Sequence, residues 1–360
     1  MFFYIPELTL WHLHSLSSPG SYLAGLPSWP ATPVLCAEVV LHSLGVIAII
    51  LQLHSTLTVF LQAVMCNPAC NVLVTGASGL LGRAVCAVLR KAGHAVKGLA
   101  FSRAGPGLIK CDLTDLEAVR LVIEKEKPNF IIHTAAQRFP DVVETQYEET
   151  RILNIKSAEN IASLAHQIKC KMIHISTDYV FDGTSPPYKV GDKCNPLSKY
   201  GLTKLESEEA VLAAAPDACV LRIPVLYGPV ERLEESAVTC LLNILKSREP
   251  KAVSHHDQRC PAHVRDIAHI LADMIALIAK GQNLSGIYQW SGREKLTKYE
   301  MTLTMARVFS LPHDHVTPSM DASPLRPYDP EMDVSRLTEL GISHHTKFEE
   351  AIKECLSAWL

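Results

Sequence analysis

Asn71-Val-Leu-Val-Thr-Gly76-Ala-Ser-Gly79-Leu-Leu-Gly82 is the stretch that decides the fold of this chain. It begins with an apolar run, Val72–Val74, that is long enough for a buried strand, and apolar residues recur at helical spacing over Leu80–Leu89. Three glycines lie between these two patterns. The first permits a tight turn, the second lets backbone N–H groups approach a pyrophosphate, and the third lets the helix pack on the strand. The stretch therefore predicts a strand, a glycine turn and a helix that bind a dinucleotide.

Length, charge and cysteine content narrow the class of protein. A chain of 360 residues can bury one large α/β core or two smaller ones. Its net charge of −3 gives no reason to expect nucleic acid or an anionic membrane as a partner. The 11 cysteines are scattered, and the close pair Cys66 and Cys70 has no histidine near enough to suggest zinc. We expect reduced thiols, no metal site and a cytoplasmic location.

Residues 1–70 differ in character from the rest of the chain. Their only charged residues are Glu7 and Glu38, and no lysine or arginine precedes Arg83. Val39–Met65 is apolar and long enough to cross a bilayer, but polar side chains interrupt it and no basic flank sets an orientation. Two interpretations stay open: a membrane or targeting segment, and an extension dispensable to the fold. The second is favoured because a signal peptide would begin with positive charge.

Strand and helix patterns alternate from Asn71 to about residue 230. Further strands are predicted at Ala95–Ala100, Phe130–His133, Lys171–Ser176 and Cys219–Ile223, and helical periodicity covers Asp141–Gln167 and Tyr200–Ala214. This alternation predicts an α/β fold with a Rossmann-type, doubly wound parallel sheet over residues 71–230.

The region 231–360 is predicted to form a smaller C-terminal lobe of the kind that binds substrate. Helices are expected at Glu231–Lys246, Val264–Lys280 and Lys347–Trp359, and a strand at Gly286–Trp290. Thr297 and Glu300 form a capping box that opens a helix ending near Phe309. We expect the helix at about 264–280 to pack back on the Rossmann domain.

Dinucleotide preference is set at the end of the second strand. Phe101-Ser102-Arg103 stands where an acidic residue would favour NAD, and a guanidinium suits the 2′-phosphate of NADP. A solvated surface arginine is the alternative interpretation of Arg103. Asp112, after the next short strand, could accept from an adenine amino group or cap the helix that begins near Asp115.

Thr177, Tyr200 and Lys204 are the catalytic candidates if the chain is a reductase. Tyr200 and Lys204 are one helical turn apart, so their side chains emerge on one face. A lysine ammonium beside a phenol would lower its pKa and make the tyrosine a proton donor or acceptor. A hydroxyl from Thr177, at the end of a neighbouring strand, would position a substrate oxygen.

Four motifs together resemble the extended short-chain dehydrogenase/reductase family. They are G-x-x-G-x-x-G at 76–82, H-T-A-A at 133–136, S-T-D-Y-V-F-D-G at 176–183 and Y-x-x-x-K at 200–204. Within that family, Ile175–Gly183 resembles the dTDP-4-dehydrorhamnose reductases. The resemblance covers about Asn71 to Leu360.

A closer similarity is to the regulatory β subunits of methionine adenosyltransferase. It rests on Val220–Gly228, Leu233–Val238, Gln258–Arg259, His263–Asp266, Trp290–Gly292 and Thr297–Met301. This resemblance implies a reductase fold that binds NADP without catalysis and modulates S-adenosylmethionine synthesis by binding the catalytic α subunit. The alternatives are an NADP-dependent reductase of a 4-keto nucleotide sugar, and a membrane-tethered redox-sensing or scaffold protein.

The same resemblance implies a set of cofactor contacts. The pyrophosphate would be held by the turn bounded by Gly76 and Gly82, at Ser78, Gly79, Leu80 and Leu81. The adenosine phosphate would contact Phe101, Ser102 and Arg103, and the adenine would be flanked by Asp112 and Leu113. The nicotinamide side would be lined by Thr134, Arg138, Tyr200 and Leu226, and Lys204 would reach the ribose. Tyr200 and Lys204 can serve binding alone, so they do not by themselves imply turnover.

Overall fold

The computed structural model describes residues 68–360. The proposed extension over residues 1–70, with its apolar segment Val39–Met65, lies almost entirely outside the described residues. Within residues 68–360, no helix combines the length and the apolar character that a bilayer span requires.

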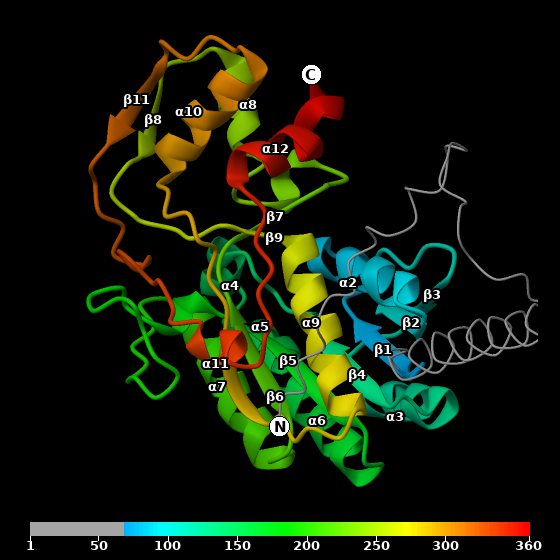
Figure 1. The fold of residues 1–360 in the computed structure, drawn as a ribbon. Helices are drawn as coiled ribbons and strands as arrows, with labels where there is room; N and C mark the ends of the chain where they lie inside the picture. Colours follow the sequence, from blue (N-terminus) through cyan, green and yellow to red (C-terminus); the bar gives the residue numbers. More distant parts are fainter. Residues whose placement is uncertain (1–67) are drawn as a thin grey trace, which may run out of the picture. The chain divides into compact units, whose positions relative to one another are not determined.

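A seven-stranded sheet forms the centre of the fold (Figure 1). Its strands run in the order β3-β2-β1-β4-β5-β6-β10, and every neighbouring pair is parallel. They are β1 (Asn71–Thr75), β2 (Ala95–Ala100), β3 (Leu108–Lys110), β4 (Phe130–His133), β5 (Lys171–Thr177), β6 (Cys219–Ile223) and β10 (Gly286–Gln289). The strand order reverses between β1 and β4, and in such sheets a ligand binds in the crevice beyond the carboxyl ends at this point. The predicted fold class is confirmed.

Helices cover both faces of the sheet because successive strand side chains point to opposite sides. Val72 and Val74 of β1 contribute to one apolar core with the helices α2 (Leu80–Lys91) and α9 (Val264–Ala279). Leu73 lies in the opposite core. That core also contains side chains of α3 (Leu116–Glu126), α6 (Ser157–Gln167) and α7 (Lys199–Ala214).

The smaller lobe has a separate apolar core beyond the strand ends (Figure 1). Its buried side chains include Leu242, Met305 and Ile352, which come from three different helices. The elements here are α8 (Leu241–Ser247), α10 (Lys298–Phe309), α12 (Phe348–Leu356) and the parallel pair β8 (Lys251–Ser254) and β11 (Val316–Ser319). The short pair β7 (Leu226–Tyr227) and β9 (Ala262–His263) lies at the base of the lobe. The remaining short elements are α4 (Pro140–Thr145), α5 (Tyr147–Arg151), α11 (Ser335–Thr338) and the 3-10 turns Asp178–Val180 and Ser357–Trp359.

Most strand and helix predictions match the structure, including the Thr297–Glu300 capping box at the start of α10. After β9 the chain returns to the sheet. The helix α9 packs on α2, and β10 extends the sheet beside β6. The domain boundary near residue 230 stays a prediction.

Two helix predictions are wrong in part. The single helix expected over Asp141–Gln167 is divided into α4, α5, a π-helical segment (Ile152–Lys156) and α6. The π segment contains Asn154, whose side chain both accepts from the Gln137 N–H and donates to the Gln137 carbonyl. Such bulges redirect a side chain at the expense of helix regularity.

The helix expected over Glu231–Lys246 begins only at Leu241. Its first part is a 3-10 turn, Leu233–Glu235, followed by one extended residue, Ser236, and a turn over 237–240. Two tertiary anchors replace helical bonds here. Ser236 donates its hydroxyl to the Leu226 carbonyl, and the Glu235 carboxylate is bound by arginines of the Rossmann part. Contacts from distant segments therefore override the local helical periodicity.

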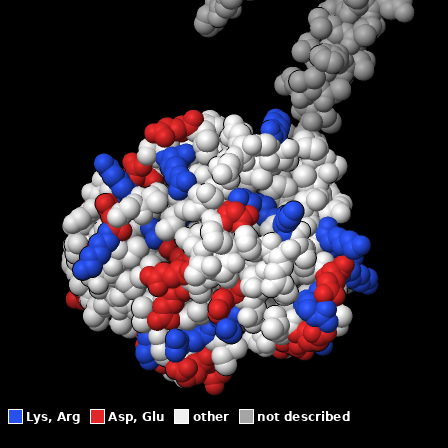
Figure 2. Space-filling view, turned by 90° about the horizontal axis from the view of Figure 1, so that it is seen from below, with Lys and Arg blue, Asp and Glu red and all other residues white. Residues whose placement is uncertain are grey.

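Charged side chains are mixed on the surface. On the face drawn in Figure 2, lysines and arginines lie beside aspartates and glutamates. This arrangement agrees with the near-neutral net charge and gives that face no dominant field of one sign.

Candidate functional site

A cavity of about 710 Å³ lies between the carboxyl ends of the strands and the smaller lobe. Every site residue predicted from the sequence lines it. They are Gly76, Ser78, Gly79, Leu80, Leu81, Gly82, Phe101, Ser102, Arg103, Asp112, Leu113, Thr134, Arg138, Thr177, Tyr200, Lys204 and Leu226. The structure thus gathers segments that are far apart in the sequence into one site, and the role of each residue there stays a prediction.

The glycine turn is shaped by close backbone contacts. Gly76 adopts φ +65°, and the Gly79 N–H donates to its carbonyl (2.8 Å). A Cβ on Gly82 would lie 2.2 Å from the Gly76 oxygen, which no side chain tolerates. No side chain caps α2 at its amino terminus, so the first N–H groups of this helix face the cavity as anion donors.

Arg103, at the carboxyl end of β2, is held by two carboxylates of the smaller lobe. It donates to Glu231 (2.9 Å) and to Glu235 (2.6 Å). Its side chain is 43% exposed, so it is neither a free surface group nor a buried one. The guanidinium that we expect to bind a 2′-phosphate therefore already binds carboxylates of the same chain.

Asp112 does not cap the following helix. Asp115 does so, by accepting from the N–H groups of Glu117 and Ala118 at the start of α3. Asp112 instead accepts from the backbone N–H and the hydroxyl of Thr114 (2.9 and 2.7 Å) and lines the cavity. The capping interpretation is wrong for Asp112, and the adenine contact stays a prediction.

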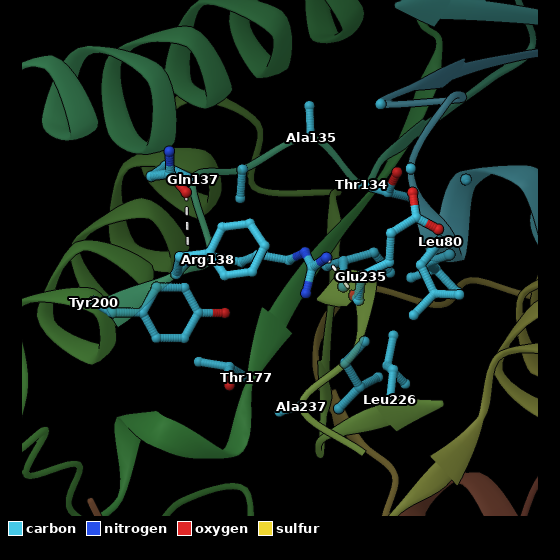
Figure 3. A pocket seen from close by; sticks show the side chains of 18 of the residues that line it. Leu80, Thr134, Ala135, Gln137, Arg138, Thr177, Tyr200, Leu226, Glu235 and Ala237 are labelled. Atoms are coloured by element: carbon cyan, nitrogen blue, oxygen red, sulfur yellow. Dashed lines mark hydrogen bonds between the residues drawn. The ribbon is translucent and has the colours of Figure 1, made fainter. Parts of the chain in front are cut away.

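Thr177 and Tyr200 lie side by side on the cavity wall (Figure 3). Burial raises the pKa of Tyr200 to about 12, although hydrogen bonding with Thr177 opposes this shift. The charge of Asp178 raises it further. The expectation that Lys204 would lower the pKa of Tyr200 is therefore wrong in this structure.

Lys204 is directed toward a buried histidine instead. Its Nζ lies 3.2 Å from Nε2 of His174, which is also 2.9 Å from the Ser207 hydroxyl. Burial lowers the pKa of Lys204 to about 8, and the charge of Glu208 opposes that shift. The Y-x-x-x-K pair thus shares a helix face, but its lysine has a partner that the motif did not indicate.

Sequence reasoning missed several charged groups on the lobe side of the cavity. Glu235 stands inside a stretch quoted for the family resemblance, but nothing local marked it as a site residue. Arg259, Lys298 and Arg326 also line the cavity from three separate segments. Arg83 is on the sheet side and does not line the cavity, but it binds the Glu235 carboxylate (2.7 Å). Its position directly after Gly82, in the first turn of α2, could have indicated it. Within residues 68–360, no group of three or more His, Cys, Asp or Glu side chains is placed to hold a metal ion.

The sequence is similar to known proteins over nearly all of the residues that the structure describes. Methionine adenosyltransferase 2 subunit beta from Xenopus tropicalis is 44% identical over 298 residues, which cover 81% of this chain and 89% of that protein. The chain belongs to the methionine adenosyltransferase 2 subunit beta family. Residues 70–360 of this family member also match the RmlD substrate binding domain family.

More distant relatives of this subunit beta family member are reductases. A dTDP-4-dehydrorhamnose reductase from Aggregatibacter actinomycetemcomitans is 30% identical over 238 residues, covering 65% of this chain and 78% of that protein. The crystal structure of dTDP-4-dehydrorhamnose reductase from Bacillus anthracis in complex with NADP has a TM-score of 0.70. It is 23% identical and covers 81% of this chain and 98% of that one. The subunit beta family member therefore has a fold that holds a nicotinamide dinucleotide in a solved relative.

Proposed function

We propose that this chain is an NADP-binding regulatory subunit that binds the catalytic α subunit of methionine adenosyltransferase and modulates S-adenosylmethionine synthesis. The observation that carries the proposal is its 44% identity to a methionine adenosyltransferase subunit beta over 89% of that protein. Identity of this extent spans the Rossmann part and the smaller lobe together, so it is not confined to a shared nucleotide-binding motif. A cytoplasmic location goes with this role.

The residues of the cavity fit NADP. The backbone leaves no room for a Cβ at Gly76 or Gly82, and backbone N–H groups at the start of α2 suit a pyrophosphate. Arg103, with Arg83 near it across the shared Glu235 carboxylate, provides the positive charge that a 2′-phosphate needs. Asp112 and Leu113 would flank the adenine, and Thr134, Arg138 and Leu226 the nicotinamide side, all from the lining of one cavity.

A binding role also agrees with the state of the candidate catalytic groups. A phenol with a pKa of about 12 is a poor proton donor near neutral pH compared with one activated by a nearby ammonium. Lys204 contacts His174, and in this role it and Tyr200 hold the cofactor without turnover.

The second candidate function is an NADP-dependent reductase of a 4-keto nucleotide sugar. The juxtaposition of the Thr177 and Tyr200 hydroxyls in the cavity favours it (Figure 3). Reduced NADP would supply a hydride in such a reaction, while Thr177 would position the substrate oxygen and Tyr200 would hold the proton for it.

Co-purification with a methionine adenosyltransferase catalytic subunit tests the main proposal. The two proteins should elute together in size-exclusion chromatography, and S-adenosylmethionine synthesis should change in rate or substrate affinity when this chain is added. The experiment is run with and without NADP. Separate elution in both conditions, with unchanged synthesis, would reject the regulatory role.

A turnover assay separates the two candidates. We expect little or no NADPH oxidation with a 4-keto nucleotide sugar, for the wild type and for Tyr200→Phe alike. Steady oxidation by the wild type that is lost in Tyr200→Phe would establish the reductase function. The matched control is Tyr299→Phe, which removes a phenol hydroxyl from a side chain that packs against the lobe core instead of lining the cavity.

A further inference from the structure

The Glu235 carboxylate, on the cavity wall, is bound by two arginines and a backbone N–H group. It accepts from Arg83 (2.7 Å), from Arg103 (2.6 Å) and from the backbone N–H of Glu231 (3.0 Å). Its side chain is 4% exposed. Burial alone would raise the pKa of Glu235, but these hydrogen bonds and the charge of Arg83 outweigh burial and lower it to about 2. The group is therefore ionised at any physiological pH.

The arginines that bind the Glu235 carboxylate belong to the Rossmann part: Arg103 lines the cavity, and Arg83 lies just outside its lining. Arg83 lies in the first turn of α2, beside the glycine turn, and Arg103 follows β2. Both come from the part of the site that the proposed function assigns to the pyrophosphate and the adenosine phosphate. The lobe thus places a carboxylate where two cations of the cofactor site converge.

The turn that carries Glu235 is fastened to the same wall by its backbone. Arg138 extends its guanidinium across the cavity and donates to the Glu235 carbonyl (Figure 3). Leu233 is buried in the lobe core, and the Thr239 hydroxyl donates to its carbonyl. The 3-10 turn Leu233–Glu235 is therefore held by contacts on both sides, and Arg103 is one of the three arginines that bind Glu235.

We propose that Glu235 is an internal substitute for the 2′-phosphate of NADP, and that NADP displaces it from Arg103 and so loosens the 3-10 turn. This inference rests on the proposed NADP site. A carboxylate and a phosphate compete for the same guanidinium because both accept charge-assisted hydrogen bonds from it. NAD carries no phosphate at this position, so it leaves the Glu235–Arg103 pair in place.

Glu235→Gln is the variant that tests the competition. It removes the negative charge and keeps the size of the side chain. We expect it to bind NADP roughly tenfold more tightly than the wild type, because the buried Glu235 carboxylate no longer competes for Arg103 and only the pair with the exposed Glu231 remains. NAD affinity should stay within about threefold of the wild type. The measurement is isothermal titration calorimetry with NADP and NAD.

Glu234→Gln is the matched control. It makes the same charge change in the same turn, but Glu234 is exposed and accepts from Asn243 rather than from either arginine. Its NADP affinity should equal that of the wild type. Tightening of the same size in Glu234→Gln would mean that general field effects, and not competition at Arg103, determine the affinity, and would overturn the proposal.

A second measurement uses the wild-type chain alone. Arg232 is exposed, but the next residue, Leu233, is buried, so trypsin can cut between them only when the turn opens. We expect NADP, but not NAD, to speed this cleavage, as detected by mass spectrometry of the fragments. Slower cleavage with NADP, or equal rates with both cofactors, would reject the displacement.

The two proposals fail in different ways. A wild-type chain that binds no NADP would reject the NADP site of the proposed function, and the inference with it. A wild-type chain that binds NADP, with Glu235→Gln equal or weaker in NADP affinity, would reject only the role given to Glu235.

Discussion

The two walls of the cavity are built in different ways. The sheet wall consists of contiguous turns at strand ends, and backbone and small residues such as Gly76 and Gly82 determine its shape. The lobe wall places long charged side chains, Glu235, Arg259 and Lys298, each from a different segment, beside apolar ones such as Val238 and Met301. The sheet wall therefore provides a rigid cradle, and the lobe wall provides charges that can be rearranged.

This difference matters for how the site could change in evolution. A backbone cradle suits any dinucleotide, because phosphates and N–H groups are common to NAD and NADP. Charged side chains on a separate lobe can change without altering that cradle. A reductase fold can therefore keep its cofactor site while the lobe acquires a different task, which is the relation we propose between this chain and the reductases it resembles.

The largest effect is expected from a substitution that disrupts the glycine turn of the sheet wall. In Gly82→Ala the new Cβ would lie 2.2 Å from the Gly76 oxygen and 2.8 Å from Ala77 Cα, so the turn must deform. We expect the free energy of unfolding to fall by about 3 kcal/mol and NADP binding to be lost. Denaturant unfolding and calorimetry measure both. Gly105→Ala is the control, because a Cβ there meets nothing within 4 Å; equal stability of the two variants would contradict the cradle argument.

The next effect concerns Asp178, where the sheet wall meets Arg259 of the lobe. Burial raises the pKa of Asp178 to about 6, although Arg259 and hydrogen bonds oppose the shift. Below about pH 4 the carboxyl is protonated in the folded and unfolded chain alike, and above about pH 6 the folded chain must hold it ionised. The wild type should therefore lose stability relative to Asp178→Asn between pH 4 and 6, by about 3 kcal/mol.

Unfolding curves of both proteins across this pH range measure the difference. The comparison with Asp178→Asn cancels the titration of the buried histidines, which is common to the two chains. Asp314→Asn, at an exposed position, serves as the control and should show no such pH-dependent gap. A gap that narrows as the pH rises would mean that the ionised form of Asp178 is the stabilised one.

A smaller effect is expected when one arginine is removed from each wall and the affinity for each cofactor is compared. Arg103→Ala should weaken NADP binding by roughly ten- to a hundredfold, about 1.5–3 kcal/mol, with a much smaller change for NAD. Arg326→Ala, on the lobe wall, should leave both affinities within about twofold. Calorimetric titrations decide this, and equal losses for NADP and NAD in Arg103→Ala would reject the 2′-phosphate contact.

The smallest effect concerns the region before the fold. Asn67–Leu360 forms one compact unit that contains the whole cavity. A chain that begins at Asn67 should therefore bind NADP with the affinity of the full chain. Loss of binding on truncation would show that residues 1–66 take part in the site. Carbonate extraction of the full chain from membranes would test the alternative interpretation of Val39–Met65.

The sequence by itself determined the sheet wall and most of the elements. Strand, glycine turn and helix follow from the one contiguous segment Asn71–Lys91, and the capping box follows from Thr297–Glu300. Such features are local because backbone geometry and hydrogen bonds along the chain produce them. The NADP preference assigned to Arg103 is also a local inference, since Arg103 lies three residues after the end of β2, and it stays a prediction.

Only the tertiary structure decided what those residues contact. Arg103 meets Glu235, 132 positions away, and Lys204 meets His174, 30 positions away and on a different element. No periodicity relates such pairs, because the packing of the lobe on the sheet brings them together. For the same reason the expected helix at Glu231 gives way to a 3-10 turn: the bonds of the buried Glu235 carboxylate to arginines of another region outweigh the local helical preference.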